Sequence, residues 1–336
     1  MFDCVAVVGA TGAVGREFIQ LISQRSFGAK RFKLLASARS AGTAVRVNGH
    51  QLTVEQLDPS SFDGVDLAFF SAGGSVSKTY APAAVRSGCV VVDNSSAFRM
   101  DPNTPLVVPE VNPDDVKSHS GVIANPNCST IIMVVPLWPL HRENPIQRVV
   151  VSTYQAASGA GQAAMHELEQ QTRHVLDAKP VVPRLMPFQY AFNLFSHNSD
   201  IGDNGYNTEE MKMINETRKM FHCDDIRITA TCVRVPVMRA HSEAINIRFA
   251  RPITPDEVRA ILAQAPGVTI VDQRDPQHFP MPIEASGIDD VLVGRIRRDI
   301  SEPDGCSIDM FVCGDQLRKG AALNGIQIAE LLAQSR

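Results

Sequence analysis

Cys128 is the residue on which the chemistry predicted from this sequence depends. It follows Asn125-Pro126-Asn127, where a short strand-like run ends, and it precedes an apolar segment of helical length. The sequence therefore predicts a thiol at or next to a helix N-terminus, where unpaired N–H groups and the helix dipole favour a thiolate. A buried structural cysteine is the alternative, so this prediction needs support from elsewhere in the chain.

A nucleophilic cysteine needs a proton-transfer partner, usually a histidine. Of the nine histidines, His241 is the candidate, because it lies between two predicted strands with Arg234 seven residues before it. His166 falls on a helical stretch and His197 in a loop. The sequence alone ranks neither of them decisively above His241.

The N-terminal residues predict a nucleotide site. An apolar strand at 2–8 is followed by the sequence GATGAVG at 9–15, which opens a helix running to about Gln24. This G-x-x-G-x-x-G variant lies where dinucleotide binding requires it, because its glycines let the backbone approach a pyrophosphate held at the helix N-terminus. The loop residues predicted to bind the cofactor are Gly9, Thr11, Gly12, Ala13 and Val14.

The end of the second predicted strand, at 32–36, indicates which dinucleotide binds. An enzyme that prefers NAD usually has a carboxylate here for the ribose 2′-hydroxyl, but this chain has Ser37, Arg39 and Ser40. Two hydroxyls and a guanidinium suit a 2′-phosphate, so the sequence favours NADP. A solvated surface cation is the alternative for Arg39.

Two further apolar runs, at 65–70 and 89–92, also end in small or polar residues. In a doubly wound sheet, ligands lie beyond the carboxyl ends of the strands, so these loops should line one crevice. Arg99, just past the second loop, is either a cation directed into that crevice or a surface arginine. The residues predicted to hold the nicotinamide end are Ser71, Ala72 and Gly73.

The pattern changes after residue 127. Several later strands alternate apolar and polar residues, which is typical of a sheet with one solvated or assembly face. We expect an N-terminal Rossmann-like dinucleotide-binding domain at 1–127 and an α+β catalytic and dimerisation domain at 128–314, with a mainly antiparallel or mixed sheet. A closing amphipathic helix at 315–336 is expected to pack back on the first domain. The strands predicted for the second half are 147–155, 226–234, 243–249, 291–297 and 308–312.

Composition limits the classes of protein to which the chain can belong. Its 336 residues are 44% hydrophobic and 20% charged, which suits two globular domains. A net charge of −4 gives no general attraction to nucleic acid or to an acidic membrane surface. The seven cysteines form no C-x-x-C pair, which argues against a disulfide framework and a structural zinc site, and we predict no metal. No signal peptide or membrane-spanning run is evident, so the cytoplasm is the expected compartment.

Independent motifs along essentially the whole chain resemble aspartate-β-semialdehyde dehydrogenases. The pair Arg239-Ala240 departs from this pattern, since many members carry a small residue there, and we expect it to tune the site. The matching motifs are GATGAVG at 9–15, NPNCST at 125–130, YQ at 154–155 followed by SGAG at 158–161, EEMK at 209–212, the segment 234–241, and GRIR at 294–297.

The resemblance implies NADPH-dependent reductive dephosphorylation of L-aspartyl-4-phosphate to aspartate semialdehyde, on the pathway to lysine, methionine and threonine. In the family pattern, Cys128 attacks the acyl carbon, phosphate leaves, and a hydride reduces the thioester. His241 would be the general acid/base and Gln155 would orient the acyl intermediate. The resemblance also implies a homodimer, or a tetramer built from dimers, formed through the second domain's sheet. The further cofactor contacts that it implies are Ser158, Gly159 and Asn324.

The charges of aspartyl phosphate provide a separate test, because its carboxylate, ammonium and phosphate require cations and one carboxylate. Arg234 would bind the α-carboxylate, Glu210 the ammonium, and Arg99 with Lys212 the phosphate. For Glu210 and Lys212 the alternative is a solvated helix face, because EEMK opens a charged helix.

Three other functions remain open at this stage. An N-acetylglutamyl-phosphate reductase would keep the cysteine and histidine but has no substrate ammonium, so Glu210 discriminates. A catalytically silent paralogue would be expected to lose the nucleophile or its partner, and Cys128, Gln155, Arg234 and His241 are all present. A thiol hydrolase would need no NADP loop.

Overall fold

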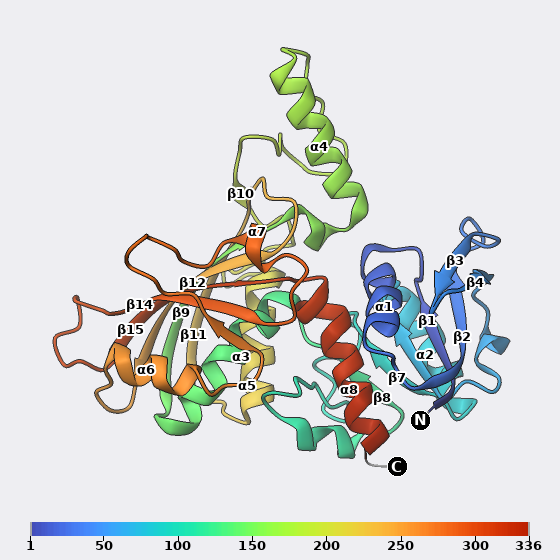
Figure 1. Cartoon of the computed structure of the whole chain (residues 1–336), viewed down its shortest axis with the longest axis horizontal. Coiled ribbons are helices and arrows are strands. Elements are labelled where there is room, and N and C mark those ends of the chain that lie inside the picture. Colours follow the sequence, from blue (N-terminus) through green and yellow to red (C-terminus); the bar gives the residue numbers. More distant parts are fainter. Residues whose placement is uncertain (1, 335–336) are drawn as a thin grey trace. The chain divides into compact units, whose positions relative to one another are not determined.

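Two compact units make up the described part of the chain, which is residues 2–334 of a computed structural model. Unit 1 consists of the described residues up to Asn127 together with those from Ala321 onward, and unit 2 is Cys128–Gly320. Figure 1 follows the chain from its N-terminal strands to the C-terminal helix.

Unit 1 is built on a parallel sheet with the strand order β5-β2-β1-β6-β7-β8. Its strands are β1 (Phe2–Val8), β2 (Ala29–Ala36), β5 (Glu55–Gln56), β6 (Leu67–Phe70), β7 (Val90–Asp93) and β8 (Val122–Ala124), with a separate hairpin of β3 (Ala44–Val47) and β4 (His50–Thr53). Its helices are α1 (Ala13–Gln24), α2 (Gly74–Arg86) and α8 (Leu323–Gln334), with the short turns η1 (Pro59–Phe62) and η2 (Pro113–Ser118).

Helices cover both faces of this parallel sheet. Successive residues of β1 point to opposite faces. Val5 and Val7 belong to a core that includes Phe18 of α1 and Ile326 of α8. The intervening residues of β1 belong to the core beneath α2, which includes Ala81. Because both faces of β1 are buried, its sequence is apolar almost throughout. The predicted Rossmann-like fold is confirmed.

Unit 2 is built on a mixed sheet with the strand order β10-β11-β9-β12-β15-β14-β13. Its strands are β9 (Ile146–Gln155), β10 (Phe195–Ser196), β11 (Arg227–Arg234), β12 (His241–Phe249), β13 (Val268–Ile270), β14 (Val291–Arg298) and β15 (Ser307–Gly314). Its helices are α3 (Cys128–Glu143), α4 (Gln162–Leu176), α5 (Thr208–Phe221), α6 (Pro255–Leu262) and α7 (Pro282–Ala285), with η3 (Ala157–Ala160). The predicted mixed sheet is confirmed.

One face of this mixed sheet is covered by helices. α3 packs against β9, β12, β14 and β15, while α5 packs against β11 and α6 against β13 and β14. α3 is buried along most of its length, so its sequence is apolar all round rather than amphipathic. On the opposite face Tyr154 is partly exposed and lies beside Phe311, with ring centroids 6.3 Å apart. We call the face under α3 the inner face.

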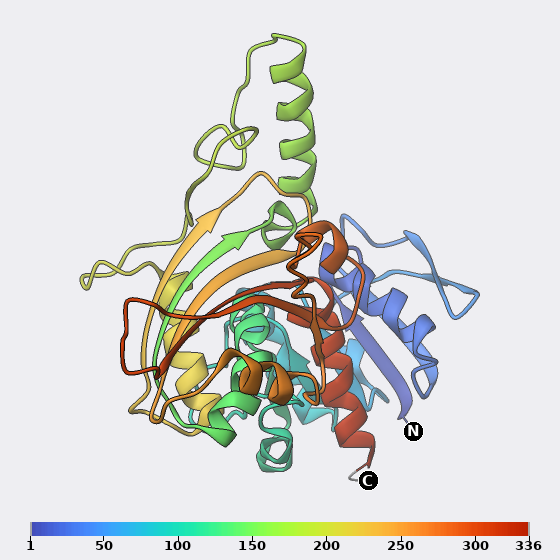
Figure 2. The same ribbon diagram turned by 60° about the vertical axis from the view of Figure 1, so that its left-hand side comes forward.

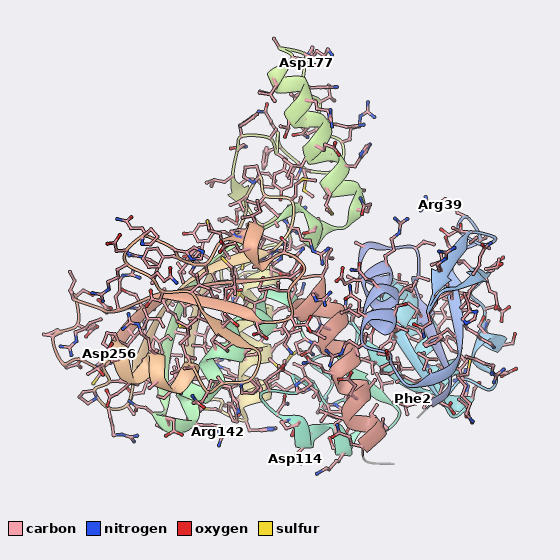
Figure 3. The ribbon with its side chains drawn as sticks, viewed as in Figure 1. Phe2, Arg39, Asp114, Arg142, Asp177 and Asp256 are labelled. Carbon is pink, nitrogen blue, oxygen red and sulfur yellow. The ribbon has the colours of Figure 1, made fainter. Side chains whose placement is uncertain are left out.

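An arm, defined as residues 162–206, begins with α4, which projects from the sheet of unit 2, and includes the edge strand β10. Figures 1 and 2 both show α4 extending away from the strands, and Asp177, which follows α4, lies at its tip (Figure 3). The arm has a small core that includes Leu168, Tyr190 and Phe195. Its exposed apolar side chains are Leu176, Val182, Leu185, Phe188, Phe192, Leu194 and Ile201.

The closing helix begins later than the sequence predicts. The chain turns at residues 315–317, passes through the π-helical η4 (Arg318–Ala322), and enters α8 at Leu323. Asp315 causes the turn, because its Oδ1 accepts hydrogen bonds from the N–H groups of Leu317 and Arg318. Within the described residues, none of the helices combines the length and apolar character needed to cross a bilayer.

Candidate active site

Four residues form a row across the inner face of the unit 2 sheet. Arg234 is opposite Gln155 on β11 and β9, and His241 is opposite Gly314 on β12 and β15. Ser242 pairs with Tyr154, so His241 and Gln155 are also opposite each other. Residues opposite each other share a face, so the strand register alone brings together three side chains that are far apart in the sequence. We call this set the catalytic row.

Cys128 is the first residue of α3, as predicted, and its Sγ lies 3.6 Å from Nε2 of His241. The thiol is partly exposed, whereas the imidazole is fully buried. The connection between β15 and α8 passes close by, because a Cβ on Gly320 would lie 3.0 Å from Cβ of Cys128. The helix N-terminus favours a thiolate at this position.

His241 is held tightly in the catalytic row. Its Nδ1 accepts a hydrogen bond from the N–H of Ala156 at 3.0 Å. Burial, together with the positive charge of Arg234, lowers the pKa of His241 to about 3. Gly159 lies against the ring, since a Cβ there would be 2.8 Å from Cε1. The imidazole is therefore neutral at physiological pH and closely packed.

Arg234 presents an unsatisfied donor beside this ring. Its NH2 donates to Nε2 of His197 at 2.7 Å, and its Nε lies 3.5 Å from Oδ1 of Asn198. Burial and the Arg234 charge lower the pKa of His197 to about 4, which leaves its Nε2 as an acceptor. Arg234 NH1 is buried and has no hydrogen-bond partner among the described residues. A buried guanidinium nitrogen without an acceptor is suited to bind an anion.

Gln155 is fixed by a buried polar network. Its Nε2 donates to Oγ of Ser129 at 3.0 Å and lies 3.3 Å from Oε1 of Glu209. The other oxygen of Glu209 accepts from Nζ of Lys212 at 2.9 Å. Glu209 is 5% exposed, so a buried carboxylate lies directly beside the catalytic row.

Glu210, predicted to bind the substrate ammonium, is bonded to two backbone N–H groups. Both of its oxygens accept backbone hydrogen bonds, one from Asn207 at 2.9 Å and one from Cys232 at 3.0 Å. Asn207 in turn caps α5 by accepting from the N–H of Glu210. Glu210 therefore joins α5 to β11, and it is Glu209 that contacts Gln155. The Asn-x-x-Glu spacing of a capping box was the sequence signal that could have separated the two glutamates.

Gln316 was missed by the sequence analysis. Its Oε1 accepts from the N–H of Ala240 at 2.9 Å, and its Nε2 donates to Oγ of Ser158. Ser158 is buried and Gly159 lies beside His241, so these two predicted cofactor residues adjoin the catalytic row. Arg239, whose type departs from the family pattern, donates to the buried Asp315 carboxylate at 2.7 Å.

The predicted nucleotide loops gather at the carboxyl ends of β1, β2 and β6 in unit 1. Gly9 has a φ of 85° and lies so close to the next loop that a Cβ would be 2.8 Å from the carbonyl oxygen of Ser71. The hydroxyl of Thr11 donates to that of Ser40 at 3.3 Å, which joins the glycine loop to the turn after β2. Gly12, Ala13 and Val14 form the start of α1. Arg39 is exposed on an outer loop (Figure 3). Of the remaining predicted contacts of this loop set, Ser37 directly follows β2, and Ala72 and Gly73 lie in the loop between β6 and α2.

Arg99 and Asn324 both hold the segment before Cys128. Nε of Arg99 donates to the carbonyl of Asn125 at 2.9 Å, and Nδ2 of Asn324 donates to Oδ1 of Asn125 at 2.7 Å. Asn324 also donates to the carbonyl of Val107 at 2.9 Å. These bonds fix the Asn-Pro-Asn turn of unit 1. Among the described residues there is no group of three His, Cys, Asp or Glu side chains arranged to hold a metal.

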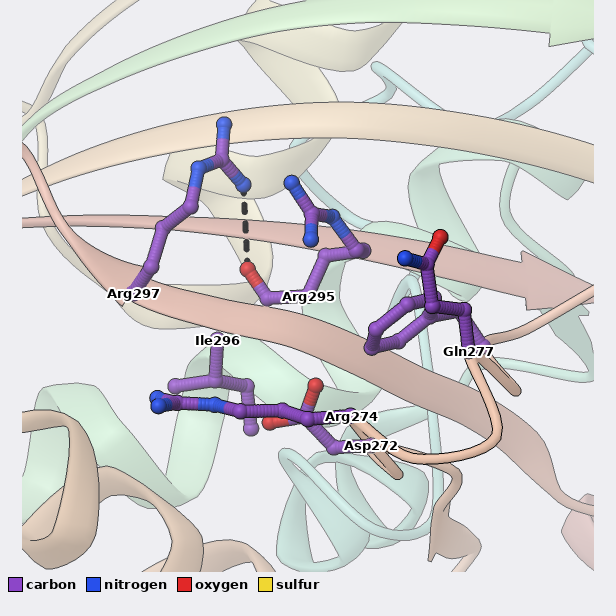
Figure 4. Close-up of a pocket in the computed structure, with 7 residues that line it drawn as sticks. Asp272, Arg274, Gln277, Arg295, Ile296 and Arg297 are labelled. Atoms are coloured by element: carbon purple, nitrogen blue, oxygen red, sulfur yellow. Dashed lines mark hydrogen bonds between the residues drawn. The ribbon is translucent and has the colours of Figure 1, made fainter.

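A separate pocket of about 350 Å³ lies at β14 and contains none of the predicted site residues (Figure 4). The guanidinium of Arg295 lies over the ring of Phe279, 5.0 Å from its centroid. Arg295 and Arg297 belong to the GRIR motif, so that motif contributes to this pocket and not to the catalytic row. Arg297 also donates to the carbonyl of Arg295.

Comparison with known proteins places this geometry in a family. The semialdehyde dehydrogenase NAD binding domain matches residues 4–119, and the semialdehyde dehydrogenase dimerisation domain matches residues 137–319. The chain belongs to the semialdehyde dehydrogenase family.

Relatives named aspartate-semialdehyde dehydrogenase match nearly the full length. The one from Synechocystis is 55% identical over 98% of this chain and 97% of its own length. The one from Bacillus subtilis is 50% identical over 98% of this chain and 96% of its own. The crystal structure of aspartate semialdehyde dehydrogenase II from Vibrio cholerae complexed with ASA is 43% identical, with a TM-score of 0.96 over 99% of both chains. The Candida albicans enzyme with NADP is 27% identical, with a TM-score of 0.75 over 99% of both chains.

Proposed function

We propose that this chain catalyses the NADPH-dependent reductive dephosphorylation of L-aspartyl-4-phosphate to L-aspartate-4-semialdehyde, in the biosynthesis of lysine, methionine and threonine. The observation that carries the proposal is the position of Cys128 beside the catalytic row, with its Sγ 3.6 Å from Nε2 of His241. The full-length relatives support the same activity.

Cys128 is the proposed nucleophile. Its thiolate attacks the acyl carbon, and the bond between that carbon and the phosphate oxygen breaks. Phosphate departs, and the acyl group remains on the sulfur as a thioester. Gln155 orients the acyl group, because its amide is held by Ser129 and Glu209. His241 would be the general acid/base, and its Nε2 lies 3.6 Å from the sulfur.

Each charged group of the substrate has a candidate side chain of opposite charge in this chain. Arg234 NH1 has no acceptor in the described chain and would bind the α-carboxylate. Glu209, rather than Glu210, would bind the ammonium. Lys212, and Arg99 from unit 1, remain the proposed phosphate contacts.

The residues of unit 1 fit a dinucleotide. Gly9 leaves no room for a side chain next to Ser71, and the loop N–H groups at the start of α1 suit a pyrophosphate. Ser37, Ser40 and Arg39 suit a ribose 2′-phosphate, and Gly12, Ala13, Val14, Ala72, Gly73, Ser158 and Gly159 complete the proposed contacts. When bound, NADPH supplies the hydride that reduces the thioester. We assign the dinucleotide to residues 1–127 and catalysis to residues 128–314.

The dimerisation-domain match supports a homodimer. Its surface would include the arm, which exposes a concentration of apolar side chains within that domain. The inner face is covered by helices, so the opposite face of the sheet is the second part of the proposed interface. A tetramer built from such dimers and a cytoplasmic location complete the proposal, the latter because a catalytic thiol needs a reducing compartment.

Replacing Cys128 with Ala tests the proposed function. Turnover, measured as phosphate-dependent reduction of NADP with aspartate semialdehyde, should fall to background, while NADPH binding measured by fluorescence stays intact. Cys223, a partly buried thiol just after α5, provides the matched control, and Cys223→Ala should retain full activity. Normal turnover in Cys128→Ala would contradict the mechanism.

A further inference from the structure

The last part of the arm runs beside β11 and brings a histidine to Arg234. β10 pairs antiparallel with β11, and Phe195 is opposite Arg234. The pairing continues past β10, because the N–H of His197 donates to the carbonyl of Cys232 at 2.8 Å. Side chains two residues apart on a strand share a face, so the ring of His197 lies on the face from which Arg234 projects.

The contact with Arg234 determines where the ring of His197 carries its proton. NH2 of Arg234 donates to Nε2 at 2.7 Å, and a guanidinium can only donate. Nε2 is therefore the lone-pair nitrogen, and the proton of the neutral ring is on Nδ1. Nδ1 lies 3.1 Å from Oγ of Ser199, to which it donates.

This imidazole orients the guanidinium of Arg234 without neutralising it. Nε of Arg234 is 3.5 Å from Oδ1 of Asn198, so the shorter bond at NH2 is the one that fixes the guanidinium plane. Burial, together with the Arg234 charge, lowers the pKa of His197 to about 4, and the ring carries no charge at physiological pH. A carboxylate in its place would form an ion pair with Arg234 and compete with an anionic ligand.

The same ring is connected to the start of α5. Oγ of Ser199, which accepts from Nδ1 of His197, also accepts from the N–H of Glu209 at 3.2 Å. One imidazole thus links Arg234, the proposed contact of the α-carboxylate, to the helical turn that carries the proposed contact of the ammonium. Both of these substrate groups are on one carbon atom, so their two contacts must keep a constant separation.

The fold of the arm does not depend on this side chain. The bond from the N–H of His197 is a backbone contact, and Phe195 is buried beside it. Further along the arm, the carboxylate of Glu167 accepts from the N–H groups of Leu185 and Met186. Substitution of the ring can therefore separate a role in positioning Arg234 from a role in folding.

We propose that His197 is a positioning residue for substrate binding, whose Nε2 holds the guanidinium of Arg234 so that NH1 faces the α-carboxylate. NH1 is the nitrogen that has no partner among the described residues. This inference rests on the proposed function and adds a residue to it. No bond forms or breaks at His197, so its loss should weaken substrate binding more than it slows the chemical steps.

His197→Gln and His197→Asn test this inference as a pair. The amide oxygen of glutamine reaches the position of Nε2 and can accept from Arg234, whereas asparagine reaches only as far as Nδ1. We expect His197→Asn to raise the KM for aspartate semialdehyde about tenfold with kcat within about twofold, and His197→Gln to keep KM within about threefold. An unchanged KM in His197→Asn, or an equal rise in both variants, would overturn the proposal. His174, an exposed histidine of the arm, provides the matched control, and His174→Asn should behave as wild type.

A double-mutant cycle tests whether His197 acts through Arg234. Arg234→Met removes the guanidinium and should itself lower kcat/KM strongly. In that background, His197→Asn should lower kcat/KM by less than about a further twofold, because the group that it positions is already absent. A further loss of about tenfold would show that His197 acts independently of Arg234, and would refute the proposal.

Nitrogen-15 NMR of histidine-labelled protein gives a readout that needs no substrate. The ring signals absent from His197→Gln belong to His197. At pH 6 to 8 we expect a protonated Nδ1 and an unprotonated Nε2, and Arg234→Met should shift the Nε2 resonance. A proton on Nε2 of His197 would contradict the inference whatever the activity of the chain. The expected spectrum in a chain that does not reduce NADP with aspartate semialdehyde would count against the proposed function alone.

Discussion

At the scale of single residues, two adjacent glutamates at the start of α5 have different partners. Glu209 bonds to Gln155 and Lys212, while Glu210 bonds to two backbone N–H groups. We predict that Glu209→Gln raises the KM for aspartate semialdehyde about tenfold or more, because it removes the charge that we propose binds the substrate ammonium. Steady-state kinetics of the purified variants provide the measurement.

The neighbouring substitution is the matched control. Glu210→Gln should leave KM within about twofold and lower the free energy of unfolding by about 1 kcal/mol, because one capping bond is lost. If instead Glu210→Gln raised KM more than Glu209→Gln, the assignment of the two side chains would be reversed.

The sequence predicted some of these residues better than others. Cys128 and His241 could be recognised because a strand-to-helix turn and two flanking strands constrain them locally. Glu209 could not be chosen over Glu210 without the capping box, which decides the direction of adjacent side chains. Gln316 gave no signal, since its partner Ser158 is distant in the sequence and only the fold brings them together.

At the scale of elements, β12 carries a buried glutamate two residues beyond His241 and on the same face of the sheet. Glu243 is opposite Thr153 on β9 and Val312 on β15. It is fully buried, and neither carboxyl oxygen has a hydrogen-bond partner among the described residues. Burial raises the pKa of Glu243 well above its usual value, so the folded chain holds it as a neutral acid.

This neutral acid makes stability depend on pH in a defined direction. Above about pH 4.5 the unfolded glutamate is ionised while the folded one keeps its proton, so its contribution to stability is lost as pH rises. Glu243→Gln cannot ionise and should gain stability relative to wild type by up to about 1.4 kcal/mol per pH unit above that value. Denaturant unfolding at pH 5 to 8 measures this, and parallel wild-type and variant profiles would contradict it.

The elements themselves were predictable to different degrees. The long strands of both sheets follow from their apolar runs and alternation, and the burial of the unit 1 sheet on both faces follows from the continuous apolar run of β1. The start of α8 did not follow, because the Asp315 side chain bonds to the backbone and replaces helical turns there. The short hairpin of β3 and β4 also lacked a signal, since its strands have mostly exposed side chains.

At the scale of the whole molecule, the arm predicts how copies of the chain assemble. Phe192 and Leu194 are 65% and 61% exposed, which is costly for apolar side chains unless a partner covers them. We predict that Phe192→Ser combined with Leu194→Ser shifts the protein from dimer toward monomer at micromolar concentration. Sedimentation velocity would measure the shift.

Ile300 offers a matched control for this experiment. It is 95% exposed in the turn between β14 and β15, outside the arm. Ile300→Ser should leave the sedimentation coefficient unchanged. An unchanged dimer in the arm variant would exclude the arm from the interface and leave the outer sheet face as the remaining candidate.

The lone NH1 of Arg234 has a consequence for the design of inhibitors. If NH1 binds the α-carboxylate as proposed, a compound that enters this site without an anionic group leaves a buried guanidinium nitrogen without an acceptor. Amides or esters of the α-carboxylate should therefore bind more weakly than the free acid. In the proposed function, one nitrogen that the fold leaves without an acceptor would thus contribute to selectivity for a free α-carboxylate.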